Sequence, residues 1–170
     1  MTPRFLFRSA TCGGLLAVAL MASAGAAPFS PAYIDLVDYP TYYAQGHAFH
    51  DLQRRLKHNF DESCPDTICE GEYTDYQALK LLCAVEAASG TVSECRWAFA
   101  ASELEVDPDG GRVVAQQPRW LCRLPIPAGT TVAGLFSALE GPRPLWHQFP
   151  GGGQPIFEAV SECVAGPGTR

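Results

Sequence analysis

The chain has 170 residues, with 18 Asp and Glu against 12 Lys and Arg, so its formal net charge is -6. Nucleic acids and anionic membrane surfaces are both bound through basic faces. The acidic balance therefore argues against both kinds of ligand and leaves a cationic or a neutral partner.

Residues 1–27 have the organisation of a secretory signal peptide. Arg4 and Arg8 form a positive start, and the apolar run 13–22 is shorter than the roughly 20 residues that span a bilayer. Small residues at 22–26 provide cleavage sites, and Cys12 does not lie in a lipoprotein cleavage box. We expect a cleaved leader and a periplasmic or secreted chain with no stable membrane insertion.

Removal of the leader makes the chain more acidic and leaves an even number of cysteines. Basic residues fall from 12 to 10, so the net charge becomes -8, and the seven cysteines become six. An even cysteine count in an exported chain indicates disulfides. The remaining length suits one domain. We expect an irregular segment at 28–40, one α+β domain at 41–166 and a tail at 167–170.

The pattern predicts a helix that begins near Thr41 or Gly46 and ends at Asn59. Phe49, Leu52 and Leu56 lie at i, i+3 and i+7, which forms one apolar stripe. Its basic residues would then lie in the last turns, where cations interact favourably with the helix dipole; they are Arg54, Arg55, Lys57 and His58.

A loop is expected from Phe60 to Tyr73, since Pro65 and Gly71 interrupt regular structure. Cys64 and Cys69 are five positions apart, and we expect them to close a small local ring. Between positions 61 and 75 there are six acids and no Lys or Arg: Asp61, Glu62, Asp66, Glu70, Glu72 and Asp75.

Residues 79–101 read as a hairpin that turns at residues 88–90, with Gly90 in the left-handed conformation. The expected register places Cys83 opposite Cys95, Leu81 opposite Trp97, and Leu79 opposite Phe99. It also gathers one apolar face, whereas a slip of one residue would destroy both the face and the cysteine match. Facing Cα atoms lie within disulfide range.

A second turn is expected at residues 107–111, followed by a strand through 113–114 and then 119–126. Simple pairing from this turn would place Leu121, rather than Trp120, beside Trp97. A bulge near Gln117 and Pro118 would correct the phase. The sequence therefore predicts an antiparallel meander of about three or four strands.

Two short helices follow the sheet. Thr130 or Thr131 is the expected cap of the first, which would end at Gly141-Pro142, and the second would begin at Pro155. Cys122 and Cys163 both face the core in this reading. Together these predictions give an α+β domain with helices on one sheet face and three disulfides: Cys64–Cys69, Cys83–Cys95 and Cys122–Cys163. Chain-entropy estimates are about 2, 3 and 4 kcal/mol in that order. Six cysteines allow 15 pairings, so this connectivity is a hypothesis.

The candidate chemistry is limited. His47, His50 and Asp51 lie on one side of the first helix with His58 further on, but no second ligand cluster follows, so we expect no metal site there. The acidic loop offers oxygen donors for calcium, although its spacing is not that of an EF-hand. No nucleophile motif or spare thiol is present, and we assign no catalytic residue and no cofactor.

The run from Phe60 to Tyr73, with Cys64, Asp66, Thr67, Cys69, Glu70 and Gly71, resembles a signature of small exported cysteine-rich bacterial proteins of unknown function. The resemblance covers about a third of the chain when the following hairpin is included. It implies no activity.

We expect a non-catalytic binding protein, such as an inhibitor or immunity protein, that engages a protein or cationic envelope component. The candidate binding residues are Asp61, Glu62, Asp66, Glu70 and Glu72. This hypothesis predicts salt-sensitive binding that is lost when Asp66 and Glu70 become Asn and Gln. Two alternatives stay open: a peptidoglycan or polysaccharide hydrolase that uses these carboxylates, and a calcium-stabilised structural domain.

Overall fold

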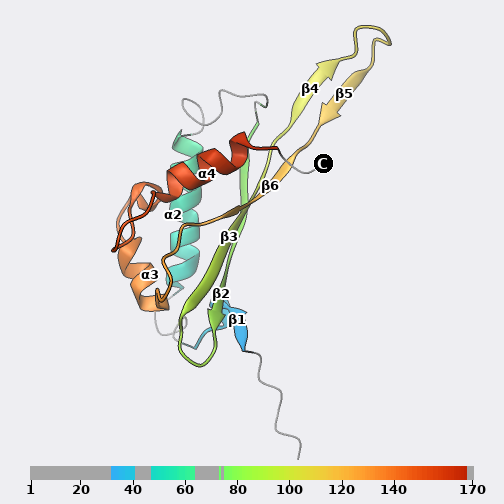
Figure 1. Cartoon of the computed structure of the whole chain (residues 1–170). Coiled ribbons are helices and arrows are strands. Elements are labelled where there is room, and N and C mark those ends of the chain that lie inside the picture. The colour runs from blue at the N-terminus through green and yellow to red at the C-terminus, as the bar shows by residue number, and fades with distance from the viewer. Residues whose placement is uncertain (1–31, 41–46, 64–72, 74, 168–170) are drawn as a thin grey trace, which may run out of the picture. The chain divides into compact units, whose positions relative to one another are not determined.

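The structure is a computed structural model that describes residues 32–40, 47–63, 73 and 75–167. Four strands form one antiparallel sheet in the order β1-β2-β3-β6, and β4 and β5 form a separate two-stranded ribbon. Figure 1 shows α2, α3 and α4 on the same side of the four-stranded sheet. The predicted α+β class, with an antiparallel meander and helices on one face, is confirmed.

Helix α2 spans Ala48–Ser63, so it continues four residues beyond the predicted end at Asn59. The apolar stripe simply extends by one more turn, because Phe60 follows Leu56 at i+4 and is fully buried. Phe60 packs against Phe99 and Trp97, with ring centroids 4.9 and 6.1 Å apart. The first four residues of the loop predicted to begin at Phe60 are therefore helical, and residues 64–72 lie outside the described part of the chain.

The longer helix also changes the role of its cations. Arg54, Arg55, Lys57 and His58 lie in its middle turns, and the last turn contains no basic residue. The predicted stabilisation of these cations by the helix dipole is therefore wrong. Asp61 and Glu62 lie near the carboxyl end instead, where acids are unfavourable. His58 Nε2 approaches Glu62 Oε1 to 3.4 Å, which offsets part of that cost when the imidazole is protonated.

Strands β2 (Gln77–Glu86) and β3 (Val92–Ala100) form the predicted hairpin. Leu81 faces Trp97 and Cys83 faces Cys95, as expected, and Gly90 has a φ of 71°. Agreement between the apolar face and the cysteine match therefore located the central register correctly.

The pairing of Leu79 with Phe99 is wrong. Phe99 pairs with Ala78, because an irregularity between Ala78 and Leu81 shifts the register by one residue. Bulges of this kind turn a side chain away from the face it would otherwise occupy. Leu79 is accordingly 54% exposed, whereas Leu81 is buried.

The second ribbon consists of β4 (Glu103–Val106) and β5 (Val113–Gln116), and β6 (Arg119–Arg123) returns along β3. Cys122 faces Trp97 and Trp120 faces Phe99, so the expected orientation of β6 is correct. The predicted bulge near Gln117 and Pro118 is wrong, since the same offset holds from Val106↔Val113 to Arg96↔Arg123. The turn is one residue longer than expected, and this alone supplies the correct phase.

The segment expected to be irregular contributes a short strand. Strand β1 (Tyr33–Asp35) pairs antiparallel with residues 84–86 of β2. The chain then leaves the sheet through the 3-10 turn η1 (Leu36–Asp38), whose start is capped by the Asp35 side chain. Leu36 is fully buried, so it fastens this segment to the core.

The C-terminal elements are α3 (Val132–Ala138), the 3-10 turn η3 (Pro144–Trp146) and α4 (Ile156–Ala165). Thr131 caps α3 by accepting a hydrogen bond from Gly134 N, and Pro155 immediately precedes α4, as predicted. Helix α4 packs against β6 and buries Ile156, Val160 and Val164.

Two of the three predicted disulfides are confirmed. Cys83 and Cys95 are joined with their Cα atoms 4.1 Å apart, and Cys122 and Cys163 with theirs 5.7 Å apart. Cys64–Cys69 lies outside the described residues and stays a prediction. Structural disulfides persist in oxidising, extracytoplasmic compartments, which the two bonds indicate for this chain. Within the described residues, no helix is long and apolar enough to cross a membrane.

Candidate functional site: the groove between α2 and β2

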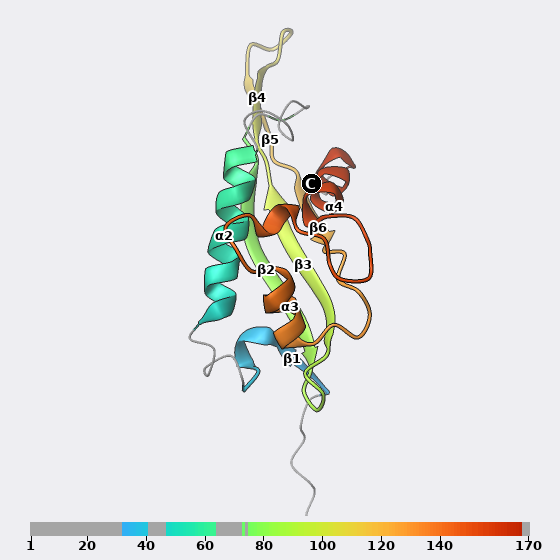
Figure 2. The same ribbon diagram turned by 90° about the vertical axis from the view of Figure 1, so that its left-hand side faces the viewer.

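A concavity lies between α2, β2 and η1, and we call it the α2–β2 groove. Its volume is about 560 Å³, within the usual range of ligand sites. Figure 2 shows α2 running beside β2, with η1 near the start of the helix. The lining residues are Asp35, Val37, Phe49, His50, Gln53, Arg54, Lys57, Leu79, Lys80, Leu81 and Trp97.

The periodicity of α2 explains the polar side of the groove. His50, Arg54 and Lys57 follow one another at i, i+4 and i+7, so they occupy one side of the helix. Phe49, Leu52 and Leu56 occupy the neighbouring side and are buried in the core. The helix therefore presents cations to the groove while its apolar stripe is held by the sheet.

The floor of the groove is apolar. Leu81 and Trp97 belong to the core face of the sheet and are 4% and 1% exposed. Leu79 lines the same groove but is 54% exposed, because the bulge turns it away from the core. An exposed leucine beside buried floor residues provides a contact surface for an apolar group.

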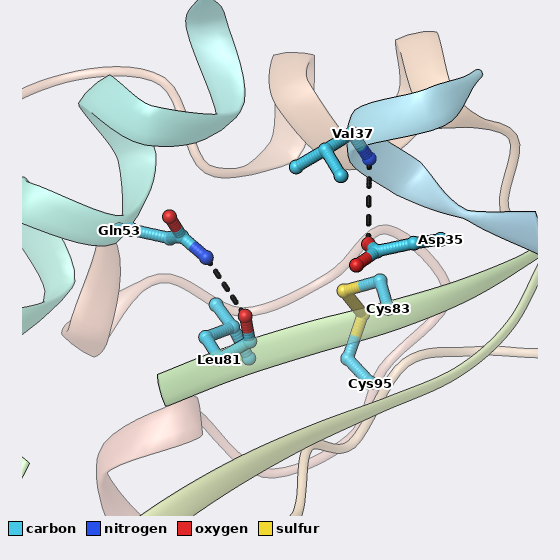
Figure 3. The surroundings of a disulfide bond; sticks show 6 residues. All are labelled: Asp35, Val37, Gln53, Leu81, Cys83 and Cys95. Atoms are coloured by element: carbon cyan, nitrogen blue, oxygen red, sulfur yellow. Dashed lines mark hydrogen bonds between the residues drawn. A yellow bond between two sulfur atoms is a disulfide. The ribbon is translucent and has the colours of Figure 1, made fainter. Parts of the chain in front are cut away.

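Two side chains of α2 contact the backbone of β2. Gln53 Nε2 donates to the Leu81 carbonyl at 2.7 Å, and Lys57 Nζ donates to the Ala78 carbonyl at 3.0 Å. Figure 3 shows Gln53 reaching Leu81 from α2, with Val37 and Asp35 across from it near the Cys83–Cys95 disulfide. Asp35 Oδ1 accepts a hydrogen bond from Val37 N at 3.3 Å, which orients this carboxylate.

The formal charge of the groove is opposite to that of the chain. Arg54, Lys57 and Lys80 line it, and Asp35 is the sole carboxylate among the lining residues that the structure describes. Arg54 forms an ion pair with Asp51, both partners being well exposed. In the part of the chain that the structure describes, no carboxylate pairs with Lys57 or Lys80. An anionic ligand with an apolar part would be complementary to this groove.

Two carboxyl groups with lowered pKa values lie outside the groove. The hydrogen bond from the Arg96 side chain, supported by the charges of Arg96 and Arg123, lowers the pKa of Glu94. Backbone hydrogen bonds from Gly110 and Asp109, together with the Arg112 side chain, lower the pKa of Asp107. Both shifts have a local structural cause, in the sheet and in the β4–β5 turn.

The predicted acidic site is only partly described. Asp61 and Glu62 are exposed in the last turn of α2, whereas Asp66, Glu70 and Glu72 lie outside the described residues. Asp75 precedes β2, where its carboxylate accepts hydrogen bonds from Gln77 Nε2 at 3.3 Å and Ser102 Oγ at 3.2 Å. The cationic groove was not among the sequence-predicted sites.

The histidines considered for a metal are near the start of α2. The rings of His47 and His50 stack with centroids 6.2 Å apart, and His47 has a φ of 62°. Over the described ranges of the chain, no three His, Cys, Asp or Glu side chains gather in a way that could hold a metal ion.

The sequence indicated one of the two features that form the groove, the basic side of α2. The spacing of His50, Arg54 and Lys57 indicates a basic side of the helix, but the predicted helix end suggested a role at the dipole. The second feature is the exposed Leu79, which depends on the bulge at Leu79 and Lys80, and no sequence pattern indicates this bulge. In comparisons with protein-family models, with curated proteins and with solved structures, no match to the chain was found.

Proposed function

We propose that the chain is an exported, non-catalytic binding protein whose ligand occupies the α2–β2 groove. The observation that carries this proposal is the combination, in one open concavity of about 560 Å³, of an apolar floor and three cations. Export is supported by the leader-like residues 1–27 and by the two disulfides.

The rigidity of the surrounding fold supports a binding role. The Cys83–Cys95 bond joins the two strands that supply Leu81 and Trp97 to the floor, so these residues are held in fixed positions. A preorganised site loses less conformational entropy when its ligand binds. We also propose that the acidic residues Asp61, Glu62, Asp66, Glu70 and Glu72 provide a second contact to the same envelope component or protein.

Site-specific photo-crosslinking in the envelope of the source cell tests the proposal. A photoreactive residue at Leu79 should give a discrete product of higher mass, whereas the same residue at Leu121 should not. Leu121 is a matched control, because it is 58% exposed and its neighbours Trp120 and Cys122 face the core. Equal products from both positions, or none from Leu79, would contradict a binding site in the groove.

A further inference from the structure

We propose that the α2–β2 groove takes an extended, acidic peptide segment of a partner protein, which adds as a strand to the open edge of β2. This inference rests on the proposed binding function and specifies its ligand. It begins from the backbone of β2 rather than from the side chains of the groove.

In the described part of the chain, most of one edge of β2 has no strand beside it. The strand spans Gln77–Glu86, but β1 pairs only with Ala84, Val85 and Glu86 before the chain leaves through η1. Among the described residues, positions 77–83 therefore lack a strand partner on the β1 side. Open edges of this kind recruit extended peptides, and this one has a length of about 20 Å at about 3.3 Å per residue.

Two carbonyl groups at this edge accept hydrogen bonds from side chains of α2 rather than from a strand. Gln53 and Lys57 donate to the carbonyls of Leu81 and Ala78. A carbonyl oxygen has two lone pairs, so a peptide N–H can bond beside the side-chain donor or replace it. If a peptide N–H displaces Lys57 from the Ala78 carbonyl, the Lys57 ammonium group becomes available to pair with an acidic side chain of the ligand.

The side chains of the groove specify the chemistry of the peptide. In an extended segment, alternate side chains point to opposite sides. One set would contact the exposed Leu79, which the bulge turns away from the core, and the other would meet Arg54 and Lys57 on the helix side of the sheet. Lys80 adds a third positive charge to the groove. The charge complementarity therefore favours a segment that alternates apolar and acidic residues, and it disfavours a basic one.

Fluorescence anisotropy with the oxidised mature protein tests the ligand class. The probe is a labelled nine-residue peptide of alternating Val and Glu, compared with the same peptide carrying Lys in place of Glu. We expect saturable binding of the Glu peptide, no binding of the Lys peptide, and weaker binding as NaCl rises from 0.05 to 0.5 M, because salt screens exposed charges. Methylation of alternate backbone nitrogens should weaken binding at least tenfold, since it removes the strand hydrogen bonds.

Matched variants locate the binding. Arg54→Gln with Lys80→Gln should weaken binding about tenfold, as expected for two exposed ion pairs. Arg123→Gln with Arg143→Gln changes the net charge equally, outside the groove, and should leave affinity unchanged. Leu79→Asp should abolish binding, whereas Leu82→Asp, at a neighbouring exposed leucine, should not. Near-UV circular dichroism checks that each variant is folded. If a double variant does not fold, Lys80→Gln alone is the mildest change in the groove, and it should still weaken binding.

The outcomes separate this inference from the proposed function. If the Glu and Lys peptides bind equally, or if the N-methylated peptide binds as well as the unmethylated one, the inference of an acidic added strand is wrong. The proposal that the groove binds a ligand would still stand. Binding of sodium laurate in place of the peptide, lost in Leu79→Asp, would assign the groove to an anionic amphiphile instead. If the Glu peptide binds and Leu79→Asp leaves its affinity unchanged, both the inference and the groove as binding site are wrong.

Discussion

Gly90 is the residue at which the β2–β3 hairpin, the N-terminal segment and the start of α3 meet. Its N–H donates to the Glu86 carbonyl at 2.9 Å, and its own carbonyl accepts from Val132 N at 3.0 Å. Its φ of 71° lies in the left-handed region, and a Cβ atom there would be 2.3 Å from Tyr39 Oη. Two independent reasons therefore favour glycine at this position: the left-handed backbone conformation and the close approach of the Tyr39 side chain.

We predict that Gly90→Ala destabilises the fold more than Gly111→Ala. Both positions have a left-handed φ, so each substitution costs about 1–2 kcal/mol of backbone strain. Gly111 has no atom near its would-be Cβ, whereas Gly90 meets Tyr39, which adds a steric cost. Urea unfolding followed by circular dichroism measures the difference. Equal midpoints would contradict the prediction, because they would show that the Tyr39 side chain moves aside without lowering the free energy of unfolding.

At the scale of elements, helix α4 is attached to β6 by a hydrogen bond and a disulfide. Trp120 Nε1 donates to the Gly166 carbonyl at 2.9 Å beyond the end of the helix, and Cys163 is bonded to Cys122. The disulfide spans 41 positions of sequence, compared with 12 for Cys83–Cys95. Closing a longer loop restricts the unfolded chain more strongly.

We predict that replacing Cys122 and Cys163 by Ala costs about 4 kcal/mol of unfolding free energy, against about 3 kcal/mol for Cys83 and Cys95. The second pair also joins residues that the β2–β3 ladder already holds opposite each other. Guanidinium unfolding of both double variants, without reductant, gives the order. A larger loss for the hairpin pair would contradict the chain-entropy explanation.

At the scale of the whole molecule, the fold could be predicted wherever two patterns agreed. The apolar alternation and the cysteine match located Cys83 opposite Cys95, and the helical stripe located α2. The prediction failed where one residue of backbone decided the result: the longer turn at 107–112 and the bulge before Leu81. The groove was missed for the same reason, since the exposed position of Leu79 in it depends on that bulge.

The proposed export of the chain gives a further prediction. Protein recovered from the cell envelope should lack the leader and contain no free thiol, because we expect its six remaining cysteines to form three disulfides. Mass spectrometry of the unreduced, denatured protein measures both. A peptide that links Cys64 to Cys69 is expected. An uncleaved N-terminus would contradict the signal peptide, and a Cys64–Cys83 link would contradict the hairpin disulfide.

The constant offset shared by the β3–β6 and β4–β5 pairs has a consequence for how the chain can change in length. Because Trp97↔Cys122 and Val106↔Val113 obey one register, the β4–β5 ribbon can shorten or grow without disturbing the core only if both strands change by the same number of residues. A single insertion in β5 would turn Trp120 and Cys122 to the opposite face and separate Cys122 from Cys163. In related sequences, length differences here should therefore come in matched pairs, while the loop at 107–112 keeps its size.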